Sequence, residues 1–406
     1  MPDTLKARDA KDVEAAVQWA LSGSKSLEIV GHGTKRALGR PAQFDATLDL
    51  SGLSGVTLYE PEELVLSARA GTPLAEIEQM VAASGQQLAF EPVDYGPLLG
   101  TPPGQATIGG VLAANVSGPR RIKAGAARDH FLGANAVSGR GEVFKSGGRV
   151  VKNVTGYDLC KLLAGSWGTL AAMTDVTIKT LPRPETEQTL MAFSLDDATA
   201  ARAMSAALGA PVDVSGAAHV PSGVAARLLA GEARAVTAFR LEGVAPSVAH
   251  RVASLEALMK PFGKTIAVGP IASRTLWQEI RDATPFATSG PSGHRIVWRI
   301  STAPLRGHEV ASVIADAADA ETFYDWGGGL VWVALAPIDD AGAALVRGAL
   351  AAVGGHATLV RAPAALRAAT APFTIEPGGL AALTKRVKES FDPQGVLGPG
   401  RMWAGV

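Results

Sequence analysis

The chain has 406 residues, enough for a large core shared between two domains. Lysine plus arginine equals aspartate plus glutamate at 38 each, which excludes the polybasic surface that nucleic acid or anionic lipid requires. The single cysteine, Cys160, can neither close an internal disulfide nor ligate an iron–sulfur cluster alone, so we expect a reducing cytosol.

Two segments bear on targeting. The N-terminal segment carries Asp, Glu and Lys throughout, so we expect no signal peptide there. Residues 95–119 carry no charge, but their prolines and glycines would break a membrane-spanning helix and leave backbone groups unsatisfied in lipid. We therefore predict a buried loop at 95–119, and not a membrane span.

Helix and strand patterns alternate at the start of the chain. Apolar residues at helical spacing predict two helices, at residues 9–21 and 73–84. β-branched runs that end at glycine or a turn predict strands at residues 26–31, 63–72 and 86–90. Further strand patterns, which predict a second and more antiparallel unit from Arg140 onward, lie at 141–147, 149–153 and 171–182.

The polar, proline-containing segment at residues 181–188 is the predicted domain boundary. The sequence beyond it predicts helices at 254–260 and 340–353 and strands at 295–301 and 329–337, and hence a mixed α+β domain. An amphipathic helix and a turn-rich tail follow at 383–403, and no internal repeat is visible in the sequence.

The stretch "IVGHGTKRALGR" (29–40) places a glycine loop directly after a strand. It is not the Rossmann fingerprint, because Arg36 stands where the third glycine would be, and no G-K-[ST] follows as in a P-loop. Its backbone N–H groups from Gly31 to Lys35 could bind a pair of phosphates. Taken alone, the stretch is more typical of an ordinary tight turn.

Two further glycine-rich segments favour a ligand site over an ordinary turn. "QATIGGVLAANVSGPRR" (105–121) combines paired glycines with small residues, which lets a flat or phosphorylated ligand approach the backbone. "KNVTGYDLCKLLAGSWGTLAAMTDVTIK" (152–179) adds three glycines along a passage from helix to strand.

Together with "FDPQGVLGPGR" (391–401), these segments resemble the PCMH-type FAD-binding fold of the vanillyl-alcohol-oxidase superfamily. Within it, "EPVDYG", "SGPRR", "KNVTGYDL", "GSWGTL" and "LPRP" resemble the glycolate oxidase FAD-binding subunit family. The resemblance implies an α+β fold: an FAD-binding domain of two α/β subdomains (1–182), a mixed α+β cap domain (183–372) and a C-terminal segment that returns to the FAD domain (373–406).

The resemblance also implies the cofactor site. The pyrophosphate loop would be Gly31, His32, Gly33 and Thr34, with Lys35 and Gly39 at its far side. The ribityl and adenine side would be lined by Pro92, Thr107, Ile108, Gly109, Gly110, Ala113, Asn115, Ser117 and Gly118. Asn153, Tyr157, Gly168 and Met173 would complete the pocket. Because Gly33 stands where the superfamily places an attachment histidine, the FAD is expected to be non-covalent.

Related 2-hydroxy-acid dehydrogenases use a metal held by cap histidines. The seven histidines of this chain are scattered, and "YDWGGGLVWVAL" (324–335) stands where the family has its histidine motif, so no metal site is expected. Arg299 alternates onto one face of a predicted cap strand, where it could bind a substrate carboxylate, although a solvated sheet arginine is the simpler interpretation.

Three functions remain open from the sequence. The first is the FAD-binding subunit of a cytoplasmic glycolate oxidase complex, which oxidises glycolate to glyoxylate with a catalytic flavin subunit and an iron–sulfur subunit. Such a complex would contact the inner face of the membrane only through its partners. The second is a free-standing FAD-dependent oxidoreductase for a hydroxy acid or alditol. The third is a non-catalytic scaffold that kept the fold.

Overall fold

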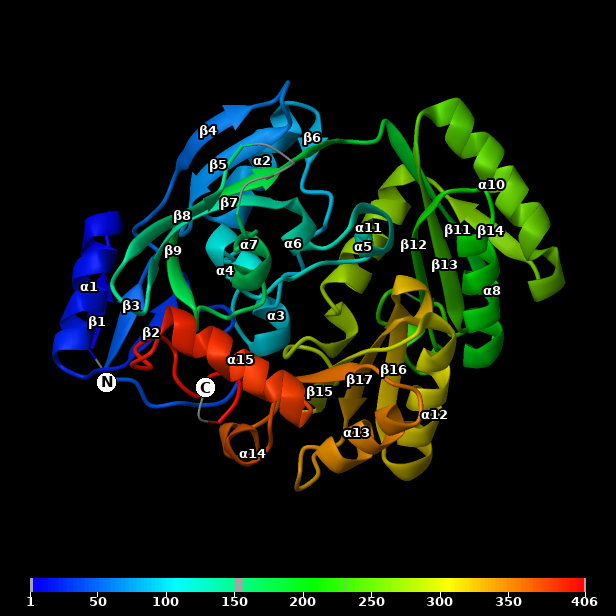
Figure 1. Cartoon of the computed structure of the whole chain (residues 1–406). Helices are drawn as coiled ribbons and strands as arrows, with labels where there is room; N and C mark the ends of the chain where they lie inside the picture. Colours follow the sequence, from blue (N-terminus) through cyan, green and yellow to red (C-terminus); the bar gives the residue numbers. More distant parts are fainter. Residues whose placement is uncertain (1–2, 150–155, 230, 405–406) are drawn as a thin grey trace.

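The computed structural model describes residues 3–149, 156–229 and 231–404. Its elements form an N-terminal unit (β1 to β10), a cap (β11 to β18) and a C-terminal segment that lies against both (Figure 1). No helix in these ranges is long and apolar enough to cross a lipid bilayer.

A small parallel sheet opens the N-terminal unit. Its strands lie in the order β1 (Asp3–Lys6), β3 (Ala46–Asp49), β2 (Leu27–Val30). Helix α1 (Ala10–Ser22) begins at Asp9, whose carboxylate accepts the backbone N–H of Lys11 at 2.9 Å and of Asp12 at 3.0 Å. Its buried residues Val13, Ala16, Val17 and Ala20 join the core of this sheet, as the helical spacing predicted.

The second sheet of this unit is antiparallel. Its order is β4 (Val56–Glu60), β5 (Val65–Arg69), β9 (Ala171–Lys179), β7 (Phe131–Ser138), β8 (Val143–Gly147). The antiparallel unit therefore starts at Val56 and not near Arg140, because β5 pairs with the distant β9. The strand expected at 86–90 is reduced to β6 (Gln86–Gln87), which pairs with β10 (Leu181–Pro182), and the strand expected at 149–153 lies almost wholly outside the described residues.

Helices fill the space between this sheet and the cap. They are α2 (Leu74–Ala83), α3 (Gly96–Leu99), α4 (Ile108–Ala113), α5 (Arg121–Ala124), α6 (Ala127–His130) and α7 (Cys160–Leu163). The uncharged stretch 95–119 thus contains two short helices and is mostly buried or half-buried, in line with its expected role as interior chain.

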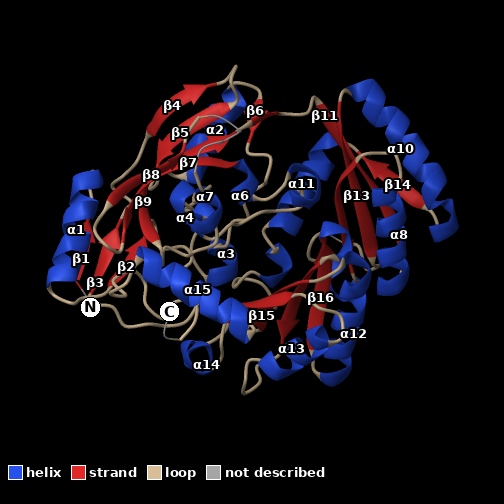
Figure 2. Ribbon diagram, in the orientation of Figure 1, coloured by secondary structure: helices blue, strands red, loops and turns tan. Residues whose placement is uncertain are grey.

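The cap is built on one antiparallel sheet, whose strands are drawn in red in Figure 2. Their order is β14-β11-β13-β12-β16-β17-β15-β18. Its first half comprises β11 (Thr186–Phe193), α8 (Asp197–Gly209), β12 (Val214–Val220), β13 (Val236–Gly243), α10 (Ala245–Met259) and β14 (Thr265–Val268). Its second half comprises β15 (Ile296–Ser301), α12 (Gly307–Ala317), β16 (Ala320–Asp325), β17 (Leu330–Leu335), α13 (Ala343–Ala351) and β18 (His356–Arg361).

Both halves of the cap follow the order β-α-β-β-α-β, and their strands occupy mirrored places in the sheet. The sequence shows no repeat because equivalent positions need only be apolar to pack. The halves join where His219 of β12 pairs with Tyr324 of β16. Between them the chain forms α11 (Pro270–Arg281), and α9 (Ser222–Ala225) lies between β12 and β13.

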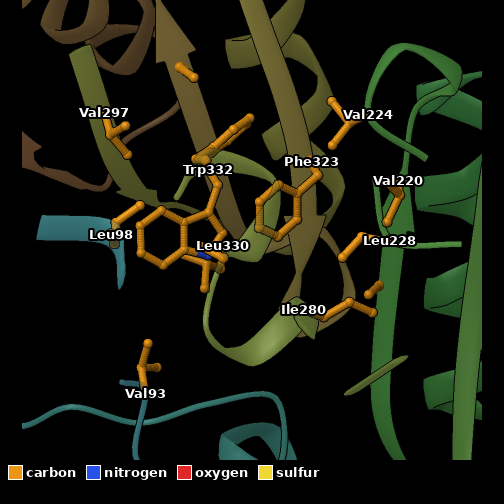
Figure 3. Packing of buried hydrophobic residues seen from close by; sticks show 14 of the residues in the cluster. Val93, Leu98, Val220, Val224, Leu228, Ile280, Val297, Phe323, Leu330 and Trp332 are labelled. Atoms are coloured by element: carbon orange, nitrogen blue, oxygen red, sulfur yellow. The ribbon is translucent and has the colours of Figure 1, made fainter. Parts of the chain in front are cut away.

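The face of the cap sheet opposite α8, α10, α12 and α13 packs on the N-terminal unit. Val93 and Leu98 from that unit join Phe323, Leu330 and Trp332 of the cap in one apolar cluster (Figure 3). A single core therefore holds the two units together. Leu38 and Val116, which belong to the first two glycine segments, are part of the same core, so this packing fixes those segments against the cap.

The C-terminal segment returns to the first sheet. After α14 (Ala364–Ala369) and α15 (Gly378–Phe391), Leu397 pairs in parallel with Leu27 of β2. The backbone N–H of Leu27 donates to Val396 O at 2.7 Å, and that of Gly398 donates to Leu27 O at 2.9 Å. The tail thus reaches the strand that leads into the first glycine loop.

Candidate functional site

A groove opens where the first and second glycine segments meet. It is lined by Ile29, Val30, Gly31, His32, Gly33, Thr34, Lys35, Arg36, Leu50, Ala70, Thr107, Gly109, Gly110, Ala113, Ala114, Trp167, Gly168, Ala171, Met173 and Arg401. Three sequence segments far apart in the chain (29–36, 107–114 and 167–173) converge here with the single residues Leu50, Ala70 and Arg401.

The loop after β2 presents unused hydrogen-bond donors. Within the described residues, no protein acceptor takes the backbone N–H of any residue from Gly31 to Lys35, whereas the next N–H, that of Arg36, donates to Gly33 O at 3.0 Å. Consecutive free N–H groups of this kind form a concave site for an anion. Donor geometry therefore favours a phosphate here.

Close packing explains why glycine is needed at the first position of the loop. A Cβ on Gly31 would lie 2.4 Å from Oγ1 of Thr107, a distance that real Cβ atoms do not adopt. Thr107 in turn caps α4, with Oγ1 accepting the N–H of Gly110 at 3.3 Å. His32 joins the same two segments, since its Nδ1 lies 3.0 Å from the backbone oxygen of Gln105.

Lys35 supplies a buried charge to this groove. The residue is 8% exposed, and within the described residues its Nζ forms no ion pair; the nearest polar contact is Thr34 Oγ1 at 3.5 Å. Burial lowers the pKa of Lys35 to about 8, with Asp94 acting in the opposite direction. A buried ammonium without a carboxylate partner is costly, and an anionic ligand would remove that cost.

Arg401 holds the loop from behind. Its guanidinium donates to Lys35 O at 2.9 Å and to Leu38 O at 3.1 Å. The same arginine lies 3.9 Å from Glu28, which also pairs with Arg36. The conformation of the loop therefore depends on a residue from the far end of the sequence.

Eleven of the residues expected from the sequence do line this groove. They are Gly31, His32, Gly33, Thr34, Lys35, Thr107, Gly109, Gly110, Ala113, Gly168 and Met173. Sequence reasoning missed Arg36, Trp167 and Arg401, although all three stand inside the quoted motifs. Each of the three has a large side chain among small ones, and a search for close backbone approach at glycines does not detect such residues.

Other expected residues lie elsewhere. Ile108 is fully buried in the core of the antiparallel sheet, and Tyr157 is 90% exposed. Pro92 borders a different cavity, beside Asp94. Asn153 lies outside the described residues.

The remaining expected residues also lie outside the groove, where they make contacts within the fold. Asn115 Oδ1 accepts the N–H of Arg128 at 3.0 Å, and Ser117 Oγ accepts that of Ala127 at 2.9 Å. Gly39 adopts φ +87° against the backbone of Arg401, and a Cβ on Gly118 would lie 2.5 Å from Glu91 O.

Arg299 lies outside the groove, in the interface between the N-terminal unit and the cap, beside Trp326. Within the described residues, no three His, Cys, Asp or Glu side chains cluster in a way that could hold a metal ion.

Comparison with known proteins identifies a cofactor of this chain. The model of the family described as FAD binding domain matches residues 4–147. The donors fit that cofactor: FAD carries a pyrophosphate, which matches five free N–H groups beside the buried Lys35. The chain therefore binds FAD.

Relatives in sequence and structure agree with this assignment. Glycolate oxidase subunit GlcE of Escherichia coli (strain K12) is 32% identical over 399 residues, covering 96% of this chain and 95% of that protein. Glycolate oxidase subunit GlcD of Bacillus subtilis (strain 168) is 24% identical over 438 residues, covering 100% and 89%. In structure, 4-ethylphenol oxidase from Gulosibacter chungangensis superposes with a TM-score of 0.74 at 14% identity, covering 99% of this chain and 89% of that chain. This structural likeness shows the PCMH-type fold, and the near-complete match to the first relative shows that the chain belongs to the glycolate oxidase subunit GlcE family of flavoproteins.

Proposed function

We propose that this chain is the FAD-binding subunit of a complex that oxidises glycolate, or a closely related 2-hydroxy acid, to the 2-oxo acid. The observation that carries the proposal is the groove with five free N–H groups and the unpaired Lys35, in a chain that matches a glycolate oxidase subunit along nearly its whole length. Bound FAD supplies the acceptor for the hydride that leaves the carbon of a CH–OH donor.

The residues of this chain would hold the cofactor in two ways. The loop Gly31 to Lys35 would bind the pyrophosphate, and the bare backbone at Gly109 and Gly110 would let the cofactor lie close to α4. We infer non-covalent binding, because the Nδ1 atom of the loop histidine, His32, is already engaged with the backbone of Gln105. Acid precipitation should therefore leave the flavin in the supernatant.

The proposal includes partner subunits. The chain has one cysteine, and Cys160 is buried, so its own residues offer no set of thiolates for an iron–sulfur cluster that would carry electrons away. We propose that a catalytic flavin subunit and an iron–sulfur subunit complete the complex, on the cytoplasmic side of the membrane. Omission of this chain from a reconstituted complex should abolish glycolate-dependent dye reduction.

Gly110→Trp tests the cofactor site, with Gly348→Trp as the matched control. A Cβ on Gly110 would point toward Thr107 Oγ1 and Lys35 Nζ, 3.1 and 4.0 Å away, whereas a Cβ on Gly348 of α13 would meet nothing within 4 Å. Titration followed by flavin fluorescence should show FAD uptake by the control and not by Gly110→Trp. Equal uptake by both variants would contradict the site. Robust glycolate turnover by this chain alone would favour a free-standing oxidoreductase.

A further inference from the structure

Two arginines, one from each unit, lie against the same tryptophan. The guanidinium carbon of Arg121 in α5 is 4.6 Å from the ring centroid of Trp326, and that of Arg299 in β15 is 4.8 Å from it. Trp326 is 8% exposed, and its Nε1 donates to Gly118 O at 3.0 Å, so its indole is fixed from the side of the N-terminal unit. Because both guanidinium carbons lie over one ring, they are no farther apart than about 9.4 Å.

Neither of these cations is neutralised. Within the described ranges, neither Arg121 nor Arg299 forms an ion pair or a side-chain hydrogen bond, whereas the adjacent Arg120 lies 2.7 Å from Glu242 and 3.0 Å from Glu91. Burial, and then the charge of Arg299, lower the pKa of Arg121, while Asp129 acts in the opposite direction and Arg128 adds to the lowering. Two half-buried like charges without an ion-pair partner are unfavourable, and an anion that contacts both would reverse that.

Two polar side chains extend this cationic cluster. Tyr95 is buried edge-on against Trp332, with ring centroids 6.4 Å apart, and its hydroxyl forms no hydrogen bond within the described part of the chain. The charges of both arginines act on His356, whose pKa is lowered first by burial and then by Arg299 and Arg121. The charge of Arg299 also acts on the buried carboxylate of Asp325, which accepts the backbone N–H of Trp326 at 2.7 Å.

We propose that Arg121 and Arg299 together bind the carboxylate of the small 2-hydroxy acid, with both guanidinium groups held against the Trp326 ring. The identity of the acid rests on the proposed function; the anion site itself rests on the arrangement of the three side chains. A guanidinium fork matches the two oxygens of a carboxylate, and one carboxylate can satisfy two forks from opposite sides. Since one arginine comes from each unit, the bound acid would bridge the N-terminal unit and the cap.

The test measures binding of oxalate, a carboxylate ligand without a CH–OH group to oxidise, to the purified full chain by titration calorimetry. Arg121→Gln and Arg299→Gln should each weaken oxalate binding 10- to 100-fold, as expected for loss of a charge-assisted hydrogen bond. Arg299→Lys, which keeps the charge and loses the fork, should lie in between. The control, Arg8→Gln, removes an exposed arginine that pairs only with Asp12, and it should stay within twofold of the parent chain.

FAD uptake is measured on the same samples. Retained FAD uptake together with oxalate affinity that both Gln variants leave unchanged would overturn this inference and leave the proposed function standing. A purely structural role of the Trp326 contacts would lower the melting temperature without changing oxalate affinity, and it too would overturn the inference. Failure of the parent chain to take up FAD would instead overturn the proposed function.

Discussion

Asp392 does not line the groove, but we expect it to control FAD binding. The Nζ of Lys388 donates to Asp392 Oδ2 at 2.6 Å, and also to the backbone oxygens of Thr169 and Leu397, both at 2.7 Å. The carboxylate of Asp392 accepts the N–H groups of Val396 and Leu397 at 2.8 and 2.7 Å. We define these contacts as the C-terminal clamp, because they set the path of the tail that carries Arg401.

Asp392→Ala should destabilise the protein strongly. Asp392 and Lys388 are 2% and 6% exposed, so the variant leaves a buried ammonium without its counterion. Breaking a buried pair from one side costs about 3–5 kcal/mol, which for a chain of 406 residues corresponds to a melting temperature lower by roughly 3–6 °C. The control lies in the preceding helix α15: Glu389→Ala removes an exposed pair with Lys385 (3.8 Å) and should cost about 0.5 kcal/mol or less.

The same change should weaken FAD binding without touching the groove. Arg401 holds the backbone oxygens of Lys35 and Leu38, and a freed tail would let the loop 31–35 lose its fixed conformation. If FAD binding must restore the conformation of about one residue of this loop, the cost is roughly 1–2 kcal/mol, which lowers FAD affinity about tenfold. Calorimetric melting and an FAD titration, both run below the melting transition, measure the two effects. If Asp392→Ala behaved like Glu389→Ala in both assays, the reasoning would be refuted.

Three single residues carry further predictions. Gly31→Ala, whose Cβ would collide with Thr107, should weaken FAD binding at least tenfold in a fluorescence titration, whereas Gly348→Ala should not. Burial opposes ionisation of Glu91, but its two arginine partners outweigh burial and lower its pKa to about 2. The Glu91 carboxylate should therefore add roughly 3 kcal/mol to the free energy of unfolding above pH 4.5, and this contribution should be lost as the pH falls toward 2. The stability gap between the parent chain and Glu91→Gln, measured by urea unfolding, should therefore narrow as pH falls through that window. Burial raises the pKa of Asp325 to about 7. Because the Asp325 anion would offset part of the positive charge of Arg299, oxalate affinity should rise as the pH falls from 8 to 6, and Asp325→Asn should remove this dependence.

The glycine segments predicted eleven of the residues that line the groove, whereas the periodic patterns misplaced parts of the fold. Gly31 and Gly109 mark close backbone approaches, which are local constraints that a sequence displays directly. Arg401 was missed because its role depends on pairing between Leu27 and Leu397, a long-range contact without a local signal. The start of the antiparallel sheet was placed too late for the same reason, since β5 pairs with a strand about one hundred residues away.

The cap shows a second limit of sequence reasoning. Arg299 was correctly placed on a strand with alternating faces, but its relation to Arg121 could not be foreseen, because only tertiary packing brings both to Trp326. The duplicated β-α-β-β-α-β order escaped notice because the two halves share an arrangement and not a motif.

Lys35→Met offers the most direct test that the groove is an FAD site. Removing a buried ammonium that has no carboxylate partner should stabilise the free protein, since burial lowers the pKa of Lys35 from 10.5 to about 8. The same change removes the charge that would face the pyrophosphate, so FAD affinity should fall 10- to 100-fold. Melting temperature and FAD affinity, measured on one sample, should therefore move in opposite directions. An unchanged FAD affinity, or a parent chain that takes up no FAD, would contradict the account.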